Sequence, residues 1–154
     1  MGIRNSEGYM GTGISKKNSE GYMDLTAHEG AKAAEKKPKW KLAYICSPYA
    51  GDIRGNVQKA IMYCRFAIEN GFMPVASHLL YPRILDDSNR KERELGLTFG
   101  LKLMKLCSQV WVFTDGEDGI SKGMQAEIAE AKRHGMRIRY FTTDLKKQTK
   151  YQRG

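Results

Sequence analysis

Four short apolar stretches alternate with stretches of helical periodicity, and this alternation restricts the fold more than any other feature of the chain. The four predicted strands cover residues 42–46, 72–76, 110–113 and 137–141; the near-continuous apolar run 42–46 is typical of a buried parallel strand, and the proline of 72–76 places it at an edge or an end. Strands that alternate with helices favour a parallel sheet with right-handed crossovers. The sequence therefore predicts an α/β protein with a small doubly wound sheet, flavodoxin-like or Rossmann-like, of about four strands with flanking helices.

The helical stretches carry apolar residues at helical spacing. The long helix predicted from Arg90 to Cys107 is apolar on two sides, so we expect one side to pack within the chain and the other against a second copy in a homo-oligomer. The helix after the third strand is expected to face the sheet through Met124, Ile128, Ala131 and Gly135. The helix after the first strand is expected to bury one face, made of Val57, Ala60, Ile61, Cys64 and Ile68.

The chain divides into three segments of different composition. Residues 1–40 form a polar, glycine-rich leader in which Asn-Ser-Glu-Gly-Tyr-Met occurs twice, at 5–10 and 18–23. We expect this leader to be a flexible arm. Residues 41–141 hold the four predicted strands, and residues 142–154 form a basic tail. A chain of 154 residues suffices for one domain with its own core.

Composition narrows the classes of function. The net charge of +9 suits attraction of a phosphorylated small molecule or of a nucleic acid, although no arginine stripe with interleaved aromatics favours the nucleic acid. No apolar run is long enough to cross a bilayer, and no secretory signal is recognisable. The three cysteines lie in apolar segments without metal-ligand spacing, so we expect reduced thiols in a cytoplasmic protein.

The loops that follow the predicted strands carry polar side chains, and in a parallel sheet these loops meet at one edge. The helix N-termini at that edge suit an anion. Hydroxyls, amides and carboxylates fit a sugar phosphate better than a redox cofactor, and the dinucleotide-binding and P-loop motifs are absent. We therefore predict neither a cofactor nor a metal. The candidate substrate-binding residues are Ser47, Tyr49, Asp52, Arg54, His78, Ser121 and Gly123.

Glu127 is distinctive because it lies on the edge of the apolar face of its helix and has no cation three or four residues away. Glu130, by contrast, is followed at those spacings by Arg133 and His134. A carboxylate without an ion-pair partner at the carboxyl edge of a parallel sheet is a candidate reagent. The simpler alternative is a solvated glutamate on the flank of a helix.

Simpler roles exist for other candidates as well. A single histidine such as His78 is more often structural or solvent-facing than catalytic. Asp86, Asp87 and Ser88 are suited to capping the long helix, and Ser121 to capping the helix that carries Glu127. The functional interpretation gains weight because all these residues would lie at one edge of the sheet.

Residues 41–141 resemble a family of small, largely uncharacterised bacterial and phage proteins, which is similar in turn to nucleoside 2-deoxyribosyltransferases and nucleoside 5′-monophosphate N-glycosidases. In these enzymes a glutamate attacks the anomeric carbon, while a serine, glycine amides and the first loop hold the ribose and phosphate. The resemblance implies that Glu127 is the nucleophile and that Ser121, Gly123 and the 47–54 loop contact the ligand. It is carried by residues 44–49, 74–82, 94–97 and 110–113 and by the pattern Ser121-x-Gly123-x-x-x-Glu127.

The chain departs from these enzymes at one place. They usually carry an aspartate in the helix before the third strand, and the corresponding stretch Thr98-Phe99-Gly100 has none. A second acid is needed to protonate the departing base. Under this resemblance, Asp86, Asp87 or Glu94 is left to supply it.

Three hypotheses about function follow. The first is an N-ribosyl hydrolase or transferase that cleaves the N-glycosidic bond of a nucleoside or nucleotide through Glu127. The second is a non-catalytic module that binds a nucleotide or a nucleotide-derived signal at the same edge. The third is nucleic-acid binding through the basic leader and tail.

Overall fold

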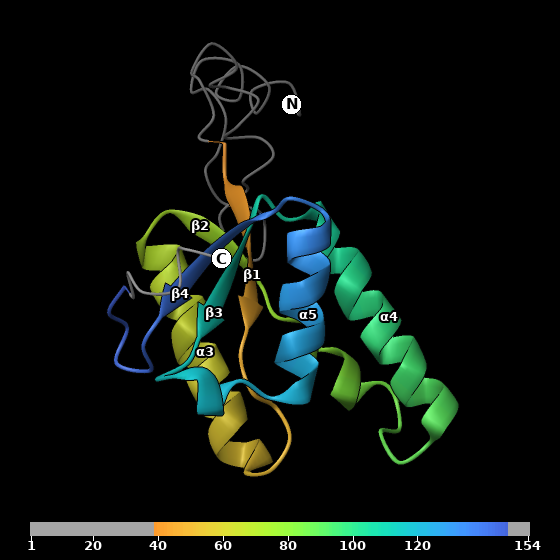
Figure 1. Cartoon of the computed structure of the whole chain (residues 1–154). Helices are drawn as coiled ribbons and strands as arrows, with labels where there is room; N and C mark the ends of the chain where they lie inside the picture. The colour runs from red at the N-terminus through yellow and green to blue at the C-terminus, as the bar shows by residue number, and fades with distance from the viewer. Residues whose placement is uncertain (1–38, 148–154) are drawn as a thin grey trace, which may run out of the picture. The chain divides into compact units, whose positions relative to one another are not determined.

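The structure is a computed structural model that describes residues 39–147 (Figure 1). The expectations for the duplicated leader segment, and for residues 148–154 of the basic tail, lie outside this range and stay predictions.

Four parallel strands form one sheet in the order β2-β1-β3-β4. They are β1 (Lys41–Cys46), β2 (Phe72–Val75), β3 (Gln109–Phe113) and β4 (Arg137–Phe141). The chain runs outward from β1 to β2 and then returns past β1 to β3, so the strand order reverses between β1 and β3. This arrangement confirms the predicted doubly wound α/β fold, in which ligands bind at the carboxyl ends of the strands beside such a reversal.

The helices cover the two faces of the sheet unequally. The helix α3 (Ile53–Glu69) lies on one face, and α4 (Arg90–Leu106) and α5 (Lys122–Arg133) lie side by side on the other (Figure 1). Successive side chains of a strand point to opposite faces. Strand β1 therefore gives Tyr44 and Cys46 to the core on the α4 and α5 side, and Ala43 and Ile45 to the core on the α3 side.

The predicted buried face of α3 was right at Ala60 and Cys64 but wrong at Ile61 and Ile68. Its buried residues are Ala60, Tyr63 and Ala67, whereas Ile61 and Ile68 are 52% and 48% exposed. The aromatic ring of Tyr63 determines this orientation, because it stacks on Phe113 of β3 with ring centroids 4.0 Å apart. A pattern based on aliphatic residues alone misses such a contact.

The long helix α4 differs from expectation at its start and on its outer side. Its N-cap is Asn89, whose side chain accepts from the backbone N–H groups of Lys91 and Glu92, so the predicted cap at Asp86, Asp87 and Ser88 was wrong. One side of α4 is buried through Gly100 and Met104. The other side is not covered within the described part of the chain, and the homo-oligomer stays a prediction. The exposed apolar residues of α4 are Leu95, Leu97 and Leu106.

The remaining helix follows its prediction at three of the four named positions, because α5 ends at Arg133 and the fourth, Gly135, is exposed beyond that end. Met124, Ile128 and Ala131 of α5 are buried against the sheet, and Ser121 caps the helix by accepting from the Met124 N–H at 3.3 Å. Among residues 39–147, no helix is both long and apolar enough to span a membrane.

Two glycines of α4 provide a matched test of its packing. A Cβ at Gly100 would lie 3.0 Å from Ser77 Oγ and 3.4 Å from the Tyr44 hydroxyl. A Cβ at Gly96 would lie no closer than 3.4 Å to any atom, and that atom is a flexible methyl group of Leu85. Both alanines gain about 1 kcal/mol of helix propensity, but only Gly100→Ala crowds a buried polar contact. We expect Gly100→Ala to be less stable than Gly96→Ala by about 1–3 kcal/mol in urea unfolding. Equal stabilities would contradict this packing.

Candidate functional site

Glu127 lies in the second turn of α5, and its carboxylate faces strand β1. The Tyr44 hydroxyl donates a hydrogen bond to Glu127 Oε1 at 2.7 Å. Tyr44 is fully buried, with its ring on the α4 and α5 side of the sheet, so its position is fixed by the core. Glu127 itself is half-buried, which keeps its carboxylate within reach of solvent.

A second hydroxyl extends this contact into a chain of hydrogen bonds. Ser77, buried just after β2, lies with its Oγ 2.7 Å from the Tyr44 hydroxyl oxygen. A tyrosine hydroxyl has one proton, and Tyr44 gives that proton to Glu127, so Ser77 must be the donor to Tyr44. Ser77 therefore donates to Tyr44, and Tyr44 donates to Glu127. Each hydrogen bond polarises the next O–H group, which strengthens the bond that Tyr44 gives to the carboxylate.

The Cys46 thiol also lies near Glu127 and interacts with its carboxyl group. It lies two residues after Tyr44 on the same side of β1 and is fully buried. Burial raises the pKa of the Cys46 thiol well above its ordinary value, and the nearby Glu127 raises it further. The pKa of Glu127 is also raised, mainly because burial disfavours its charged form, while the interactions with Tyr44 and Cys46 oppose this shift.

Glu130, one turn further along α5, shows the opposite environment. Its carboxylate contacts Lys105 at 2.8 Å, Arg133 at 2.7 Å and His134 at 3.1 Å. The predicted partners Arg133 and His134 are confirmed, and these hydrogen bonds lower the pKa of Glu130 to about 2. Within residues 39–147, Glu127 has neutral donors only, and no cation contacts it.

Three of the predicted binding residues come together beside β1. Ser47 Oγ lies 3.1 Å from His78 Nε2, and the rings of Tyr49 and His78 have centroids 6.4 Å apart. Burial lowers the pKa of His78 to about 4, so its imidazole is neutral at pH 7. A neutral ring can exchange hydrogen bonds with Ser47 or a ligand, but it holds no extra proton to donate.

The other predicted binding residues lie at the N-termini of α3 and α5, at the same edge of the sheet. Asp52 is the N-cap of α3 and accepts from the Gly55 N–H at 3.1 Å, and Arg54 is exposed in the first turn. Ser121 caps α5, and Gly123 is exposed beside it. These residues are placed at the carboxyl edge as expected, and their role in binding stays a prediction.

The two other predicted catalytic carboxylates are engaged elsewhere. Asp86 lies in an exposed turn and accepts from the backbone and hydroxyl of Ser88, which lowers its pKa. Glu94 is exposed on α4 and pairs with Arg90 at 3.0 Å. Neither has a hydrogen bond to the Tyr44 and Glu127 group. In the region that the structure describes, no three His, Cys, Asp or Glu side chains converge as metal ligands.

Gly100 of α4 packs against the hydrogen-bonded chain of Ser77 and Tyr44. A side chain at this position would point at Ser77 Oγ and the Tyr44 hydroxyl. Gly100 belongs to the stretch in which the resembling enzymes carry an aspartate. A side chain at position 100 would therefore meet Ser77 and the Tyr44 hydroxyl, and the glycine supplies none.

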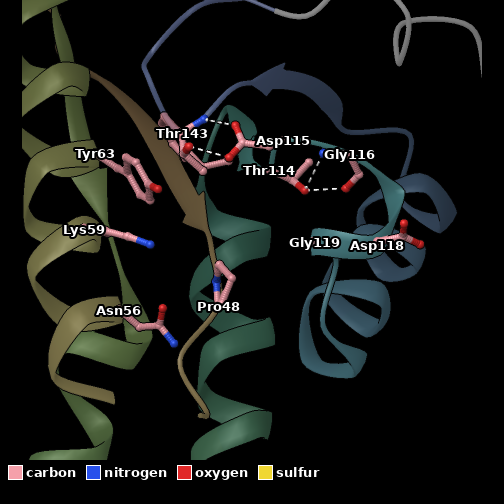
Figure 2. A pocket seen from close by; sticks show the side chains of 11 residues that line it. Pro48, Asn56, Lys59, Tyr63, Thr114, Asp115, Gly116, Asp118, Gly119 and Thr143 are labelled. Atoms are coloured by element: carbon pink, nitrogen blue, oxygen red, sulfur yellow. Dashed lines mark hydrogen bonds between the residues drawn. The ribbon is translucent and has the colours of Figure 1, made fainter. Parts of the chain in front are cut away.

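A separate cavity of about 360 Å³ opens on the α3 side of the same edge (Figure 2). This volume is within the usual range for small-molecule sites. Asp115 borders it and accepts from the Thr143 N–H at 2.7 Å and from the Thr143 hydroxyl at 2.5 Å, which ties the end of β3 to the end of β4. Glu127 does not line this cavity. Its main lining side chains are Pro48, Asn56, Lys59, Tyr63, Asp115 and Thr143.

Tyr44, Cys46 and Ser77 are the residues of this group that sequence reasoning missed. Tyr44 and Cys46 lie in an apolar run and were assigned to the core, which they also occupy. Their alternation near the carboxyl end of β1 was the available signal, since it places both on one face of the sheet. Ser77 gives no such signal, because its contact with Tyr44 depends on the loop after β2.

Comparison with known proteins places the chain in a family. Residues 41–141 match the family described as a domain of unknown function, DUF7768, and the chain belongs to that family. No curated protein matches the chain. Among solved structures, it is similar to a 2-deoxyribosyltransferase from the psychrotolerant bacterium Bacillus psychrosaccharolyticus, with 16% sequence identity and a TM-score of 0.51 over 66% of this chain and 72% of that one. This likeness shows a shared fold.

The raised pKa of Glu127 predicts how stability depends on pH. A carboxyl whose pKa is higher in the folded state favours folding at low pH, and this contribution is lost as pH rises through the folded pKa. We therefore expect Glu127→Gln to raise the free energy of unfolding by about 1 kcal/mol at pH 7 and to leave it nearly unchanged near pH 4. Thermal unfolding across pH measures this, with Glu117→Gln on the exposed loop as control. A variant less stable than the wild type at pH 7 would contradict it.

The lowered pKa of His78 is directly observable. Since burial favours the neutral ring, the imidazole should keep its neutral form down to about pH 5 and titrate near 4. The unfolded chain takes up this proton near the ordinary histidine pKa, so the stabilising contribution is lost as pH falls below about 6.5. NMR titration of the ring protons, assigned with His78→Gln, tests this; a midpoint near 6.5 would refute it.

Proposed function

We propose that the chain cleaves the N-glycosidic bond of a nucleoside or nucleotide, with Glu127 as the nucleophile. The observation that carries this proposal is the Glu127 carboxylate at the carboxyl edge of the sheet, held by Tyr44 and contacted by no cation of the described residues. The fold shared with a 2-deoxyribosyltransferase supports the same class of reaction.

Glycosidic cleavage passes through a state in which the sugar carbon C1′ carries positive charge. An oriented carboxylate stabilises this charge and then forms an ester with C1′, while the bond from C1′ to the base nitrogen breaks. Water or a second base resolves the ester, which corresponds to hydrolysis or transfer. Tyr44 orients one carboxylate oxygen by its hydrogen bond. Ser47, His78, Ser121 and Gly123 are the proposed contacts to the substrate.

A second candidate function is a binding module for a nucleotide or a nucleotide-derived signal. The observation that favours it is the lack of a side chain at Gly100, together with the exposed positions and other partners of Asp86 and Glu94. These two carboxylates remain the proposed acids under the first function. The sequence also leads us to propose that the protein is cytoplasmic and forms a homo-oligomer. Nucleic-acid binding through the basic termini is a third proposed function.

A panel of nucleosides and their 5′-monophosphates distinguishes the first two functions. Chromatography should detect released base with the wild-type chain, and Glu127→Ala should lower the rate by at least about 1,000-fold because the nucleophile is removed. Glu117→Gln, an exposed carboxylate on the loop before α5, should keep full activity.

The outcomes separate the two functions. Release that is equal in wild type and Glu127→Ala would exclude Glu127 as nucleophile. Absence of release from the whole panel, combined with thermal stabilisation by one of its members, would favour the binding module.

A further inference from the structure

Glu127 is a half-buried carboxylate whose described contacts are two neutral groups. Tyr44 donates a hydrogen bond and Cys46 lies near the carboxyl group, but neither supplies positive charge. Glu130 on the same helix is surrounded by Lys105, Arg133 and His134, so the chain neutralises one carboxylate and leaves the other. Partly buried charges are normally paired, and the missing positive charge can come from a ligand.

The two described groups that interact with Glu127, the Tyr44 hydroxyl and the Cys46 thiol, share a second property: neither is suited to donate a proton to a leaving base. Burial and the neighbouring Glu127 raise the pKa of Tyr44 above its ordinary value, and burial raises that of Cys46. His78 is neutral, and its imidazole holds no extra proton at pH 7. Gly100, whose backbone approaches the Tyr44 hydroxyl, has no side chain.

This combination restricts which bases can leave. A neutral base takes the bonding electrons from C1′ and leaves as an anion unless an acid protonates it, and such protonation typically contributes about 10²- to 10⁴-fold to the rate. A base that is already cationic takes the same electrons and leaves as a neutral molecule. It requires no acid, and its positive charge also complements the unpaired carboxylate.

We propose that the substrates of this site are N-ribosides whose base already carries a positive charge, such as a pyridinium or an N7-alkylated purine. This inference rests on the proposed function, and it specifies the substrate class for the same site. The bond from C1′ to the base nitrogen breaks, and its electron pair neutralises the base. The C1′ carbon bonds to Glu127, water then hydrolyses the ester, and one proton is released to solvent for each molecule cleaved.

Guanosine and 7-methylguanosine form a matched pair, because they differ in one methyl group and in the charge of the base. Both are incubated as nucleosides and as 5′-monophosphates with the full chain at pH 6, and free base is measured by chromatography after subtraction of the rate without protein. We expect kcat/KM for the methylated member to be at least about 100-fold higher, which is the lower end of what an acid would contribute. A pH indicator should record one proton released per methylated base.

Controls connect the preference to the carboxylate. 7-Methylguanosine should raise the melting temperature of the wild-type chain more than guanosine does, because its charged base complements the carboxylate. Glu127→Gln should abolish both this difference and the cleavage of 7-methylguanosine, whereas Glu117→Gln should preserve both. Cleavage of the two bases at similar rates would overturn this inference and leave the proposed function standing. Cleavage of neither base would overturn this inference, and cleavage of another nucleoside in the panel would then still support the proposed function.

Discussion

The pairing of β1 with β3 at the centre of the sheet is the contact on which the candidate site depends. In this register Tyr44 lies opposite Val110 and Cys46 opposite Val112. Because α5 is the next α-helix after β3, joined to it by residues 114–121, the position of β3 beside β1 also helps to place α5 over β1. Tyr44 and Glu127, which are 83 positions apart in the sequence, meet as a result of that arrangement. The helix caps at Asp52 and Ser121 then face the same edge, since each follows one of these two strands.

The electrostatics of the site follow from what the two sides of α5 contact. On the side of α5 that meets α4, Glu130 forms an ordinary ion-pair network with Lys105 and Arg133. The side of α5 that meets β1 packs against apolar residues, and the polar groups among them are the Tyr44 hydroxyl and the Cys46 thiol. A carboxylate placed there loses part of its hydration, and no described cation neutralises it. Such an arrangement costs stability, and sites of this kind are usually retained because binding or catalysis uses them.

The sequence was sufficient for the architecture and insufficient for the details of the site. Short runs rich in apolar and aromatic residues, bounded by turn residues, marked the strands. Helix α5 was oriented correctly because Met124, Ile128 and Ala131 form an unambiguous stripe. The face of α3 was wrong because its orientation depends on an aromatic stack between Tyr63 and Phe113, which is a tertiary contact. Ser77 and Tyr44 were missed for a similar reason. Their hydrogen bond depends on the path of the loop after β2 and not on any local pattern.

Strand β1 separates the Glu127 site on one face of the sheet from the aromatic core and cavity on the other face. Tyr44 and Cys46 face Glu127, while Ala43 and Ile45 belong to the core that includes Tyr63 and Phe113, the aromatic residues beside the cavity. Side chains alternate along a strand, so insertion or deletion of a single residue would exchange the two sets and disrupt both environments at once. Evolution can therefore change this strand only by substitution. Relatives that keep this fold should show no length variation between Lys41 and Cys46.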